Sequence, residues 1–328
     1  MPKKIKFLSQ ADIKKCLDMK STIEAMKIAF SELSKGNVNS PIRTNIQLKS
    51  VESGALFMPV YFPAKQLVGL KSVMIHKNNP SKDLPMIQAM YNVFDAETGE
   101  PLAIMDGEYL TSMRTGAASG LATDLLSKKE AEVAVIFGAG VQAEKQIEGI
   151  CSIRNLKRIY ISDLDNERVQ NLINKLQQNF NAEFQKLENN KLIEEADIIC
   201  TATSSSSPVF NNLNLNSKVH INGIGSYRPD MCEIPSDVIV NSKLYVDSRE
   251  ACLAEAGDIL QPINNSKITK DHIYAELGEV VSELKAGRSE QDKITVFKSV
   301  GNAVQDISTA SVILENAKNM NIGTEINL

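Results

Sequence analysis

Residues 133–143 read VAVIFGAGVQA, and the chain continues as EKQIEGIC to residue 151. The five apolar residues predict a buried strand, and the glycines predict a tight turn into a helix. Gly138 permits the turn, Gly140 lets the backbone approach a phosphate, and Ala143 takes the third small position, where helix and strand pack closely. The first N–H groups of the helix would then face that phosphate. A purely structural turn can have the same pattern, but the strand-turn-helix context favours a dinucleotide site.

A second marker is the acid that ends the next predicted strand, KRIYISD. Asp163 lies 25 residues beyond Gly138, and an acid there can bind both ribose hydroxyls and repel the extra phosphate of NADP. The alternative is a solvated acid in the loop SDLDNER, where Arg168 could serve a 2′-phosphate. The pattern favours NAD and leaves NADP open.

Strands and helices alternate around the glycine turn. Segments 131–138, 157–163, 196–203, 217–225 and 242–247 read as strands, with helices at 141–151, 165–180 and 189–196 between the earlier ones. Alternation of this kind predicts an α/β fold, a parallel sheet with helices on both of its faces.

The first hundred residues have a different texture. Residues 11–36 carry apolar residues at helical spacing and predict two short helices or one broken helix. Short alternating or apolar segments from Arg43 to Ile104, separated by Gly, Pro and Asn, predict strands in hairpins. A helix follows, with Thr111 as its expected N-cap, and residues 306–320 predict a last amphipathic helix. An α+β segment therefore precedes the α/β segment, and a helix returns at the end.

The bulk composition excludes several classes of protein. The 328 residues suit two domains, and a net charge of −4 with a pI near 5.6 argues against nucleic-acid binding. No apolar run approaches the length of a membrane span, and no secretory signal is recognised at the start. Five scattered cysteines without a CxxC pair predict reduced thiols in a cytoplasmic protein, and three distant histidines argue against a metal.

Three cations stand in otherwise apolar segments of the first half. Arg43 lies in PIRTNI, Lys71 in VGLKSVM and Arg114 in TSMRTGAA. If they face one cavity they can clamp a carboxylate, and a lysine in an apolar strand can have a lowered pKa and act as an acid or base. Taken singly, each is more often a surface cation with a buried stem, and spacing alone does not show that they converge.

Longer blocks of the sequence resemble the ornithine cyclodeaminase/mu-crystallin family. The blocks are MYNVFDAETGEPLAIMDGEYLTSMRTGAASGLATDLLS with VAVIFGAGVQA, then NGIGSYRPDMCEIP and ITVFKSVGNAVQD, in the family's order over nearly the whole chain. The resemblance implies a homodimer with a Rossmann NAD(P)-binding domain at 120–300. Residues 1–119 and 301–328 would form an α+β substrate-binding and dimerisation domain.

The resemblance also implies roles for single residues. Arg43, Lys71 and Arg114 would surround the substrate carboxylate and the nicotinamide, with Lys71 catalytic and Arg114 touching both ligands. Val300 would approach the substrate. The cofactor would be bound by Gly138, Gly140, Val141, Gln142, Asp163, Thr203, Tyr227 and Ser299. For Ser299, a loop hydroxyl that caps the last helix is the alternative.

Two positions depart from the true cyclodeaminases. Tyr227 stands where those enzymes carry the Asp thought to serve the amine, and Met86 stands where they carry Thr. A tyrosine with a pKa near 10 is a poor base, and Asp230 could replace the Asp only in a rebuilt loop. Ornithine cyclisation is therefore in doubt, whereas hydride transfer is not.

We therefore expect an NAD(P)H-dependent reductase of small cyclic α-imino acids, such as pyrroline-2-carboxylate, which arrive with the C=N bond already made. The cofactor would be NAD, with NADP possible, and the partners a small amino or imino acid and a second copy of the chain, without nucleic acid, membrane or metal. The alternatives are ornithine cyclodeaminase or an alanine-type amino-acid dehydrogenase. A cofactor-dependent binding protein of the mu-crystallin type is the alternative from another class.

Overall fold

The computed structural model describes residues 4–48, 53–76, 78–211 and 215–327. They form two compact units. Unit 1 consists of Met1–Arg114 and Asn302–Leu328, and unit 2 of Thr115–Gly301, so one boundary falls within helix α3 (Gly107–Leu126). The division predicted from the sequence lies near these points of the chain, and the roles assigned to the two domains stay predictions.

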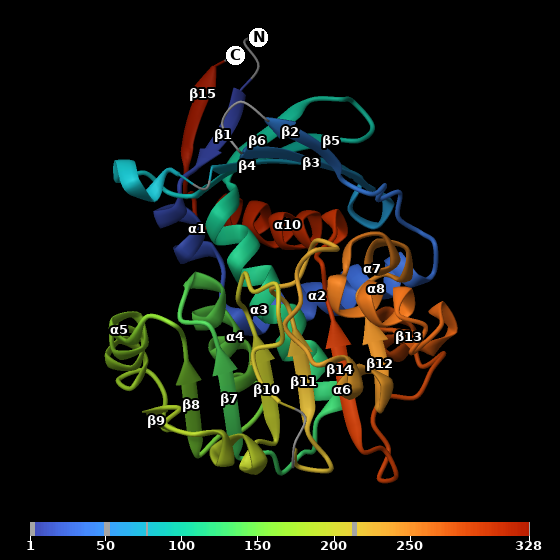
Figure 1. Ribbon diagram of the computed structural model, residues 1–328. Helices are drawn as coiled ribbons and strands as arrows, with labels where there is room; N and C mark the ends of the chain where they lie inside the picture. The colour runs from blue at the N-terminus through green and yellow to red at the C-terminus, as the bar shows by residue number, and fades with distance from the viewer. Residues whose placement is uncertain (1–3, 49–52, 77, 212–214, 328) are drawn as a thin grey trace. The chain divides into compact units, whose positions relative to one another are not determined.

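Unit 2 is built on an eight-stranded sheet, whose strands stand side by side in Figure 1. Every pairing in it is parallel, in the order β13-β12-β14-β11-β10-β7-β8-β9. The strands are β7 (Val133–Phe137), β8 (Arg158–Ser162), β9 (Glu183–Lys186), β10 (Ile198–Thr201), β11 (His220–Gly223), β12 (Ser242–Val246), β13 (Ile273–Glu276) and β14 (Ile294–Lys298). The α/β fold with a Rossmann-type sheet is confirmed.

Both faces of this sheet are buried, because alternate residues of β7 enter two different apolar clusters. Val133, Val135 and Phe137 pack in one cluster, and Ala134 and Ile136 in the other. The helices of unit 2 besides α3 are α4 (Val141–Cys151), α5 (Asn166–Leu176), α6 (Ser236–Val240), α7 (Arg249–Glu255), α8 (Gly257–Asn264) and α9 (Leu277–Val281). Since β8 and β9 continue on one side of β7 and β10 and β11 on the other, the carboxyl end of β7 lies at the switch point, where such sheets bind ligands.

Unit 1 is built on a mixed seven-stranded sheet in the order β15-β1-β6-β5-β4-β3-β2. The β1–β6 pair is parallel and the other pairs are antiparallel. The strands are β1 (Lys4–Leu8), β2 (Thr44–Leu48), β3 (Ser53–Phe62), β4 (Leu67–His76), β5 (Ile87–Asp95), β6 (Pro101–Asp106) and β15 (Thr324–Asn327). The predicted hairpin strands are confirmed.

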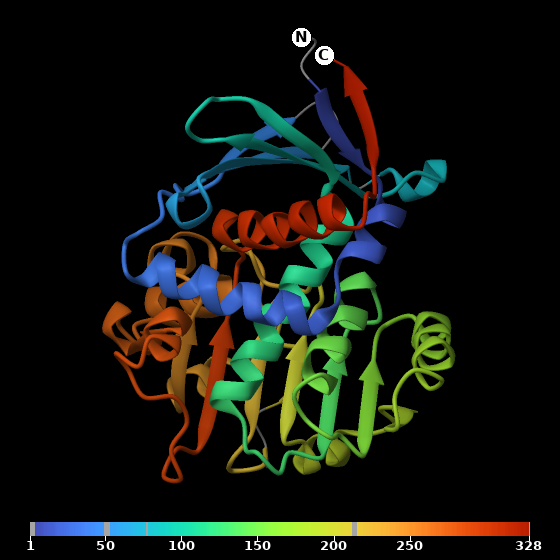
Figure 2. The same cartoon turned by 180° about the vertical axis from the view of Figure 1, so that it is seen from behind.

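One face of this mixed sheet is covered by helices. Helix α10 (Ala303–Asn319) packs on β3 and β4, and α2 (Met19–Ser34) lies along α10, as Figure 2 shows. Helix α1 (Gln10–Cys16) also contacts α10. On β4, Leu67, Gly69, Lys71 and Val73 alternate toward the covered face and are buried. The strand period therefore turns Lys71 inward, among apolar side chains.

The structure corrects some local expectations. Thr111 is not an N-cap, because α3 begins four residues earlier, at Gly107, where Asp106 accepts a hydrogen bond from the backbone N–H of Tyr109 (2.8 Å). Residues 190–195 form a 3₁₀ helix instead of an α-helix. Strands β1, β9, β13, β14 and β15 and helices α6 to α9 were not predicted.

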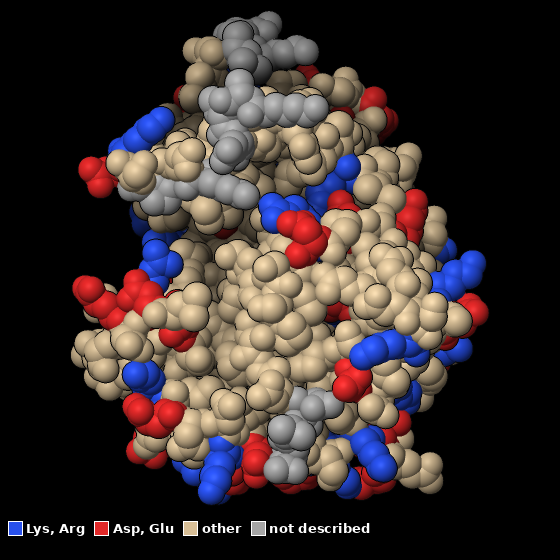
Figure 3. Space-filling model, in the orientation of Figure 1, with Lys and Arg blue, Asp and Glu red and all other residues tan. Residues whose placement is uncertain are grey.

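Charged residues of both signs lie on the face of the molecule drawn in Figure 3. Figure 3 shows Lys and Arg interspersed with Asp and Glu around a broad uncharged area on the face that it draws. On this face, neither sign of charge forms a continuous patch among the described residues. Within the described ranges, no helix combines the length and the apolar character that a membrane crossing requires.

Candidate active site

The glycine turn of unit 2 has the geometry that its sequence predicts. Gly138 has φ of 108°, and a Cβ there would lie 2.6 Å from the carbonyl oxygen of Ala202, so only glycine fits. Gly140 is the N-cap of α4, has open space where a Cβ would lie, and supplies no side-chain cap. The next residue, Val141, is 67 % exposed. The N-terminus of α4 is therefore open to a ligand that accepts hydrogen bonds.

Gln142 and Asp163 flank this turn. The Oε1 atom of Gln142 is buried and has no hydrogen-bond partner among the described residues. The half-buried Asp163 carboxylate accepts hydrogen bonds from the N–H of Ala139 (2.7 Å) and of Asp165 (3.0 Å). Asp163 thus braces the glycine turn from the end of β8, and its ribose role stays a prediction. Arg168 pairs with Asp165 at 3.4 Å.

Thr203 lies at the same carboxyl edge of the sheet, two residues beyond the end of β10. Its backbone N–H and its hydroxyl both donate to Oε1 of the buried Glu233, at 2.6 and 2.8 Å. Sequence reasoning missed Glu233, since an acid in the loop MCEIP resembles any solvated acid.

Ser299 and Val300 follow β14, and both are held by a second buried acid. Oδ2 of Asp247 accepts hydrogen bonds from the Ser299 hydroxyl (2.7 Å), the Val300 N–H (3.0 Å) and the Gly301 N–H (2.8 Å). Ser299 does not cap the last helix, because α10 has Asn302 as its N-cap. Asp247 was missed too, although an acid directly after the apolar strand SKLYV was a signal for it.

Tyr227 is half-buried and packs against the core cluster on one face of the parallel sheet. The guanidinium of Arg228 lies 5.9 Å from its ring centroid. Asp230 receives two hydrogen bonds from Arg228, both 3.0 Å long. Met86, in unit 1, is exposed. The Asp230 carboxylate is thus engaged by a neighbouring cation, and the loop is not rebuilt to make it a free base.

Unit 1 brings two of the predicted cations onto one carboxylate. Nζ of Lys71 lies 2.9 Å from both oxygens of Asp306, and Nε of Arg114 donates to Oδ1 at 3.0 Å. Arg114 also donates through Nη1 to Oε1 of Gln305 (2.9 Å), and Lys71 lies 3.3 Å from Oγ1 of Thr111. All three charged groups are buried. Asp306 was missed as a site residue because its place in the chain reads only as the acidic start of a helix.

The charges of this cluster do not balance. Lys71 and Arg114 carry two positive charges and Asp306 one negative charge. Burial lowers the pKa of Lys71 to about 8, with help from the positive charges of Arg114 and Arg43, whereas Asp306 raises it. Arg43, which is half-buried just before β2, makes the smallest of these contributions. The three predicted cations therefore share one electrostatic environment in unit 1.

The residues of unit 2 fit a dinucleotide. Four features lie at the switch point of the parallel sheet: a glycine turn, an open helix N-terminus, a buried amide oxygen without a partner among the described residues, and a carboxylate at the end of β8. These are the features that hold a pyrophosphate and a ribose.

Comparison with known proteins places this geometry in context. The family model described as ornithine cyclodeaminase/mu-crystallin family matches residues 3–321. A Delta(1)-pyrroline-2-carboxylate reductase of Bacillus cereus is 37% identical over 97% of this chain and 98% of its own length. Among solved structures, Thermococcus litoralis Delta(1)-pyrroline-2-carboxylate reductase in complex with NADH and L-proline has a TM-score of 0.95 and 36% identity, covering 98% of this chain and 100% of that one. An archaeal alanine dehydrogenase dimer with bound NAD has a TM-score of 0.91 and 29% identity, covering 99% of each chain.

Proposed function

Because the chain belongs to the ornithine cyclodeaminase/mu-crystallin family, as its motifs predicted, we propose that it reduces small cyclic α-imino acids with NADH. Pyrroline-2-carboxylate, which would yield proline, is the substrate that its 37% identical relative is named for. The observation that carries the proposal is the buried cluster of Lys71, Arg114 and Asp306, which has one positive charge in excess. Such a cluster is stabilised when a substrate carboxylate enters it.

Arg114 is the group best suited to bind that carboxylate. Its Nε and Nη1 are held by Asp306 and Gln305, so the guanidinium is fixed in orientation before substrate arrives. A fixed, planar guanidinium binds a carboxylate with little loss of conformational freedom. Arg43 would add a further positive charge for the carboxylate, and its charge also lowers the pKa of Lys71 slightly.

Lys71 is the proton donor in this proposal. With a pKa of about 8, most Lys71 side chains are protonated at neutral pH. The resulting ammonium group can still release its proton readily. Reduction of a cyclic imine adds a hydride to the carbon beside the carboxylate and needs one proton at the ring nitrogen. Lys71, or a water molecule that it holds, supplies that proton. Asp306 fixes its Nζ at 2.9 Å.

Unit 2 would hold the cofactor through its glycine turn. When bound, NADH supplies the hydride. Gly138, Gly140, Val141 and Gln142 would bind the pyrophosphate, and Asp163 the adenosine ribose, which favours NAD over NADP. Further support comes from the relatives of 36% and 29% identity that contain NADH and NAD. Thr203, Tyr227, Ser299 and Val300 would complete the site, with Val300 toward the substrate.

Cyclisation of ornithine is the less favoured reaction. Tyr227 replaces the expected base, and Asp230 is paired with Arg228 at 3.0 Å. Expelling ammonia requires a general base beside the amine, whereas reduction of a preformed imine does not.

We also propose that the protein is a homodimer formed through the open face of the unit 1 sheet. Cross-strand register places Ile46, Tyr61, Met74 and Met90 on the face opposite Lys71, and each is between 36 and 54 % exposed. An exposed apolar face across four strands fits a second copy of the chain. The alanine dehydrogenase relative is a dimer. Sedimentation equilibrium should give twice the chain mass of 36.0 kDa.

The five cysteines support a cytoplasmic location. All five are unpaired, and four of them are buried. Free thiols are the usual state of cysteines in a reducing compartment.

The activity is tested by following NADH absorbance with purified protein and pyrroline-2-carboxylate at neutral pH. Oxidation with this imine alone is the expected result. Oxidation only with pyruvate and ammonia would indicate an amino-acid dehydrogenase. Release of ammonia and proline from ornithine with NAD would indicate the cyclodeaminase. NADH binding without any turnover would leave a binding protein and contradict the proposal.

A further inference from the structure

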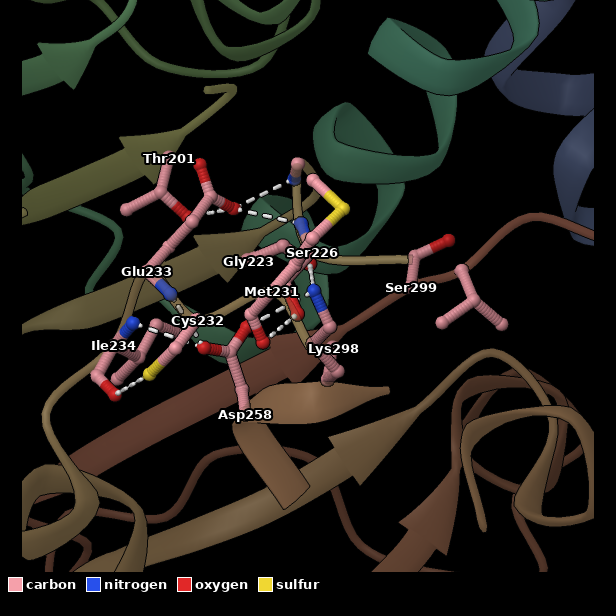
Figure 4. A network of polar contacts seen from close by, with 12 residues as sticks. Thr201, Gly223, Ser226, Met231, Cys232, Glu233, Ile234, Asp258, Lys298 and Ser299 are labelled. Atoms are coloured by element: carbon pink, nitrogen blue, oxygen red, sulfur yellow. Dashed lines mark hydrogen bonds and ion pairs between the residues drawn. The ribbon is translucent and has the colours of Figure 1, made fainter. Parts of the chain in front are cut away.

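Two loops of the proposed cofactor edge in unit 2 converge on one carboxylate, that of Glu233. Oε1 accepts hydrogen bonds from the N–H and the hydroxyl of Thr203, after β10. Oε2 accepts from the Thr201 hydroxyl (2.9 Å) and from the N–H groups of Gly225 (2.7 Å) and Ser226 (3.0 Å), after β11. Figure 4 shows this carboxylate directed toward Thr201 and the backbone at Ser226. Glu233 therefore ties the ends of two neighbouring strands together.

We propose that Glu233 is a positioning residue for the cofactor, holding Thr203 and the Gly225–Tyr227 segment in the form that binds the nicotinamide half of the dinucleotide. The inference rests on the proposed function, and it concerns a residue that contacts no ligand itself. Glu233 is fully buried, so it acts only through the groups that it holds.

The contacts require a carboxylate at this position. Three of the five donors are backbone N–H groups, which cannot accept, so a neutral amide would point N–H groups at some of them. Burial raises the pKa of Glu233, and the nearby Lys298 opposes this rise. Gly225 has no room for a Cβ, because the carbonyl oxygen of Thr203 and Oε1 of Glu233 occupy that space. The two loops are therefore closed tightly around the carboxylate.

A buried ion pair fixes the backbone of Glu233 in turn. Oδ1 of Asp258 accepts from the N–H groups of Glu233 (2.7 Å) and Ile234 (3.0 Å). Its Oδ2 lies 3.1 Å from Nζ of Lys298, which also donates to the carbonyl oxygen of Gly223 (3.1 Å). Figure 4 shows the Asp258 and Lys298 side chains pointing toward each other beneath this loop. Main chain and side chain of Glu233 are thus both fixed.

This arrangement determines which hydrogen bond the Thr203 hydroxyl can make with a ligand. Its hydroxyl hydrogen is directed to Glu233, and its oxygen already accepts from the N–H of Ser205 at 3.2 Å. The hydroxyl can therefore only accept a hydrogen bond from a ligand. The carboxamide N–H or a ribose hydroxyl of the nicotinamide half would supply that donor.

The test is the affinity for NADH, measured by fluorescence titration of the full chain. Glu233→Gln should weaken NADH binding about tenfold, because a loop N–H loses its acceptor and the loops shift. Glu233→Asp, which keeps the charge on a shorter side chain, should fall between this variant and the unchanged protein. In both variants, KM for NADH should rise more than kcat falls.

Asp197→Asn is the matched control. Asp197 is a buried carboxylate of the same sheet, and it accepts from the N–H groups of Glu132 (2.8 Å) and Val133 (3.2 Å) at the opposite, amino end of the strands. This variant should lower the melting temperature as Glu233→Gln does and leave NADH affinity unchanged. Equal weakening in both variants, or an unchanged affinity in Glu233→Gln, would overturn the inference.

Thr201→Val serves if Glu233→Gln does not fold. It removes one donor to Glu233 behind the loop, at a fully buried position. We expect a several-fold weaker NADH affinity, and an unchanged affinity would overturn the inference. If the unchanged protein does not bind NADH, the proposed function itself fails. If it does bind NADH and the variants match it, only the positioning role fails.

Discussion

Each unit of the molecule buries a lysine against an aspartate, and the two pairs differ in what surrounds them. In unit 1, the Lys71–Asp306 pair at 2.9 Å is joined by Arg114, so positive charge is in excess. In unit 2, the Lys298–Asp258 pair at 3.1 Å lies beside Glu233, so negative charge is in excess. The excess negative charge is met by three backbone N–H groups and two hydroxyls. Among the described contacts of the unit 1 cluster, no second anion is present.

This difference in charge suits the unit 1 cluster to bind a ligand and the unit 2 cluster to hold the fold. A buried charge must be paired or hydrogen-bonded, or it costs several kcal/mol. Unit 2 meets this requirement with its own backbone N–H groups and hydroxyls, so no ligand is needed to balance the charge. Unit 1 leaves a positive charge for an anion to neutralise, which is how a substrate carboxylate would be selected.

The largest expected effect is on turnover, in Lys71→Met. Loss of the proton donor should lower kcat for imine reduction by about 10²–10⁴-fold. The free energy of unfolding should change by less than about 1 kcal/mol, because Arg114 still pairs with Asp306 after the excess charge is removed. Steady-state kinetics and denaturant unfolding check the two parts. A large loss of stability with normal turnover would show that Lys71 supports the fold and does not donate the proton.

Lys298→Met should instead affect mainly the stability of the protein. It leaves Asp258 and Glu233 buried together without their cation, so the free energy of unfolding should fall by about 3–5 kcal/mol. Denaturant unfolding measures this loss. If the two variants unfold with equal free energies, the two clusters do not differ in their need for the lysine.

The sequence predicts those features of the fold and of the candidate site that depend on local pattern. Gly138, Gly140 and the apolar strand before them define a strand-turn-helix by themselves, and Lys71 stands out in an apolar strand. Asp306 could not be found in this way, because it is 235 residues away from Lys71 in the sequence and only the tertiary fold brings the two together. In the sequence, Glu233 resembles an ordinary loop acid and Asp258 an acid at the start of a helix. Only the structure shows the groups that donate hydrogen bonds to them. Strands β1 and β15 pair the two ends of the chain, which no local pattern reveals.

A smaller effect concerns the pH dependence. If Lys71 donates the proton, the rate of reduction should fall as pH rises through about 8, the pKa of the lysine. Asp306 raises that pKa, so in Asp306→Asn the pKa of Lys71 should be lower and the fall should begin at lower pH. Profiles of kcat/KM between pH 6 and pH 10, about two units either side of that pKa, test this. A profile in Asp306→Asn that is unmoved or displaced toward alkaline pH contradicts the assignment.

The smallest expected effect lies in the choice of cofactor. Asp163→Ala should weaken NADH by about tenfold and NADPH much less, because the acid accepts from the ribose hydroxyls and repels a 2′-phosphate. Since Asp163 also braces Ala139 at 2.7 Å, part of the loss will be common to both cofactors. The ratio of the two dissociation constants isolates the ribose contribution. An unchanged ratio would leave Asp163 as a brace only.

Calorimetric binding in the presence of NADH shows whether the excess positive charge of unit 1 binds a carboxylate. L-Proline and L-prolinamide differ only in that one carries a carboxylate and the other an amide. This carboxylate-binding role predicts that L-proline binds, that L-prolinamide binds far more weakly, and that Arg114→Ala removes the difference while NADH binding persists. Equal binding of the two ligands, or an undiminished preference for L-proline in Arg114→Ala, would contradict it.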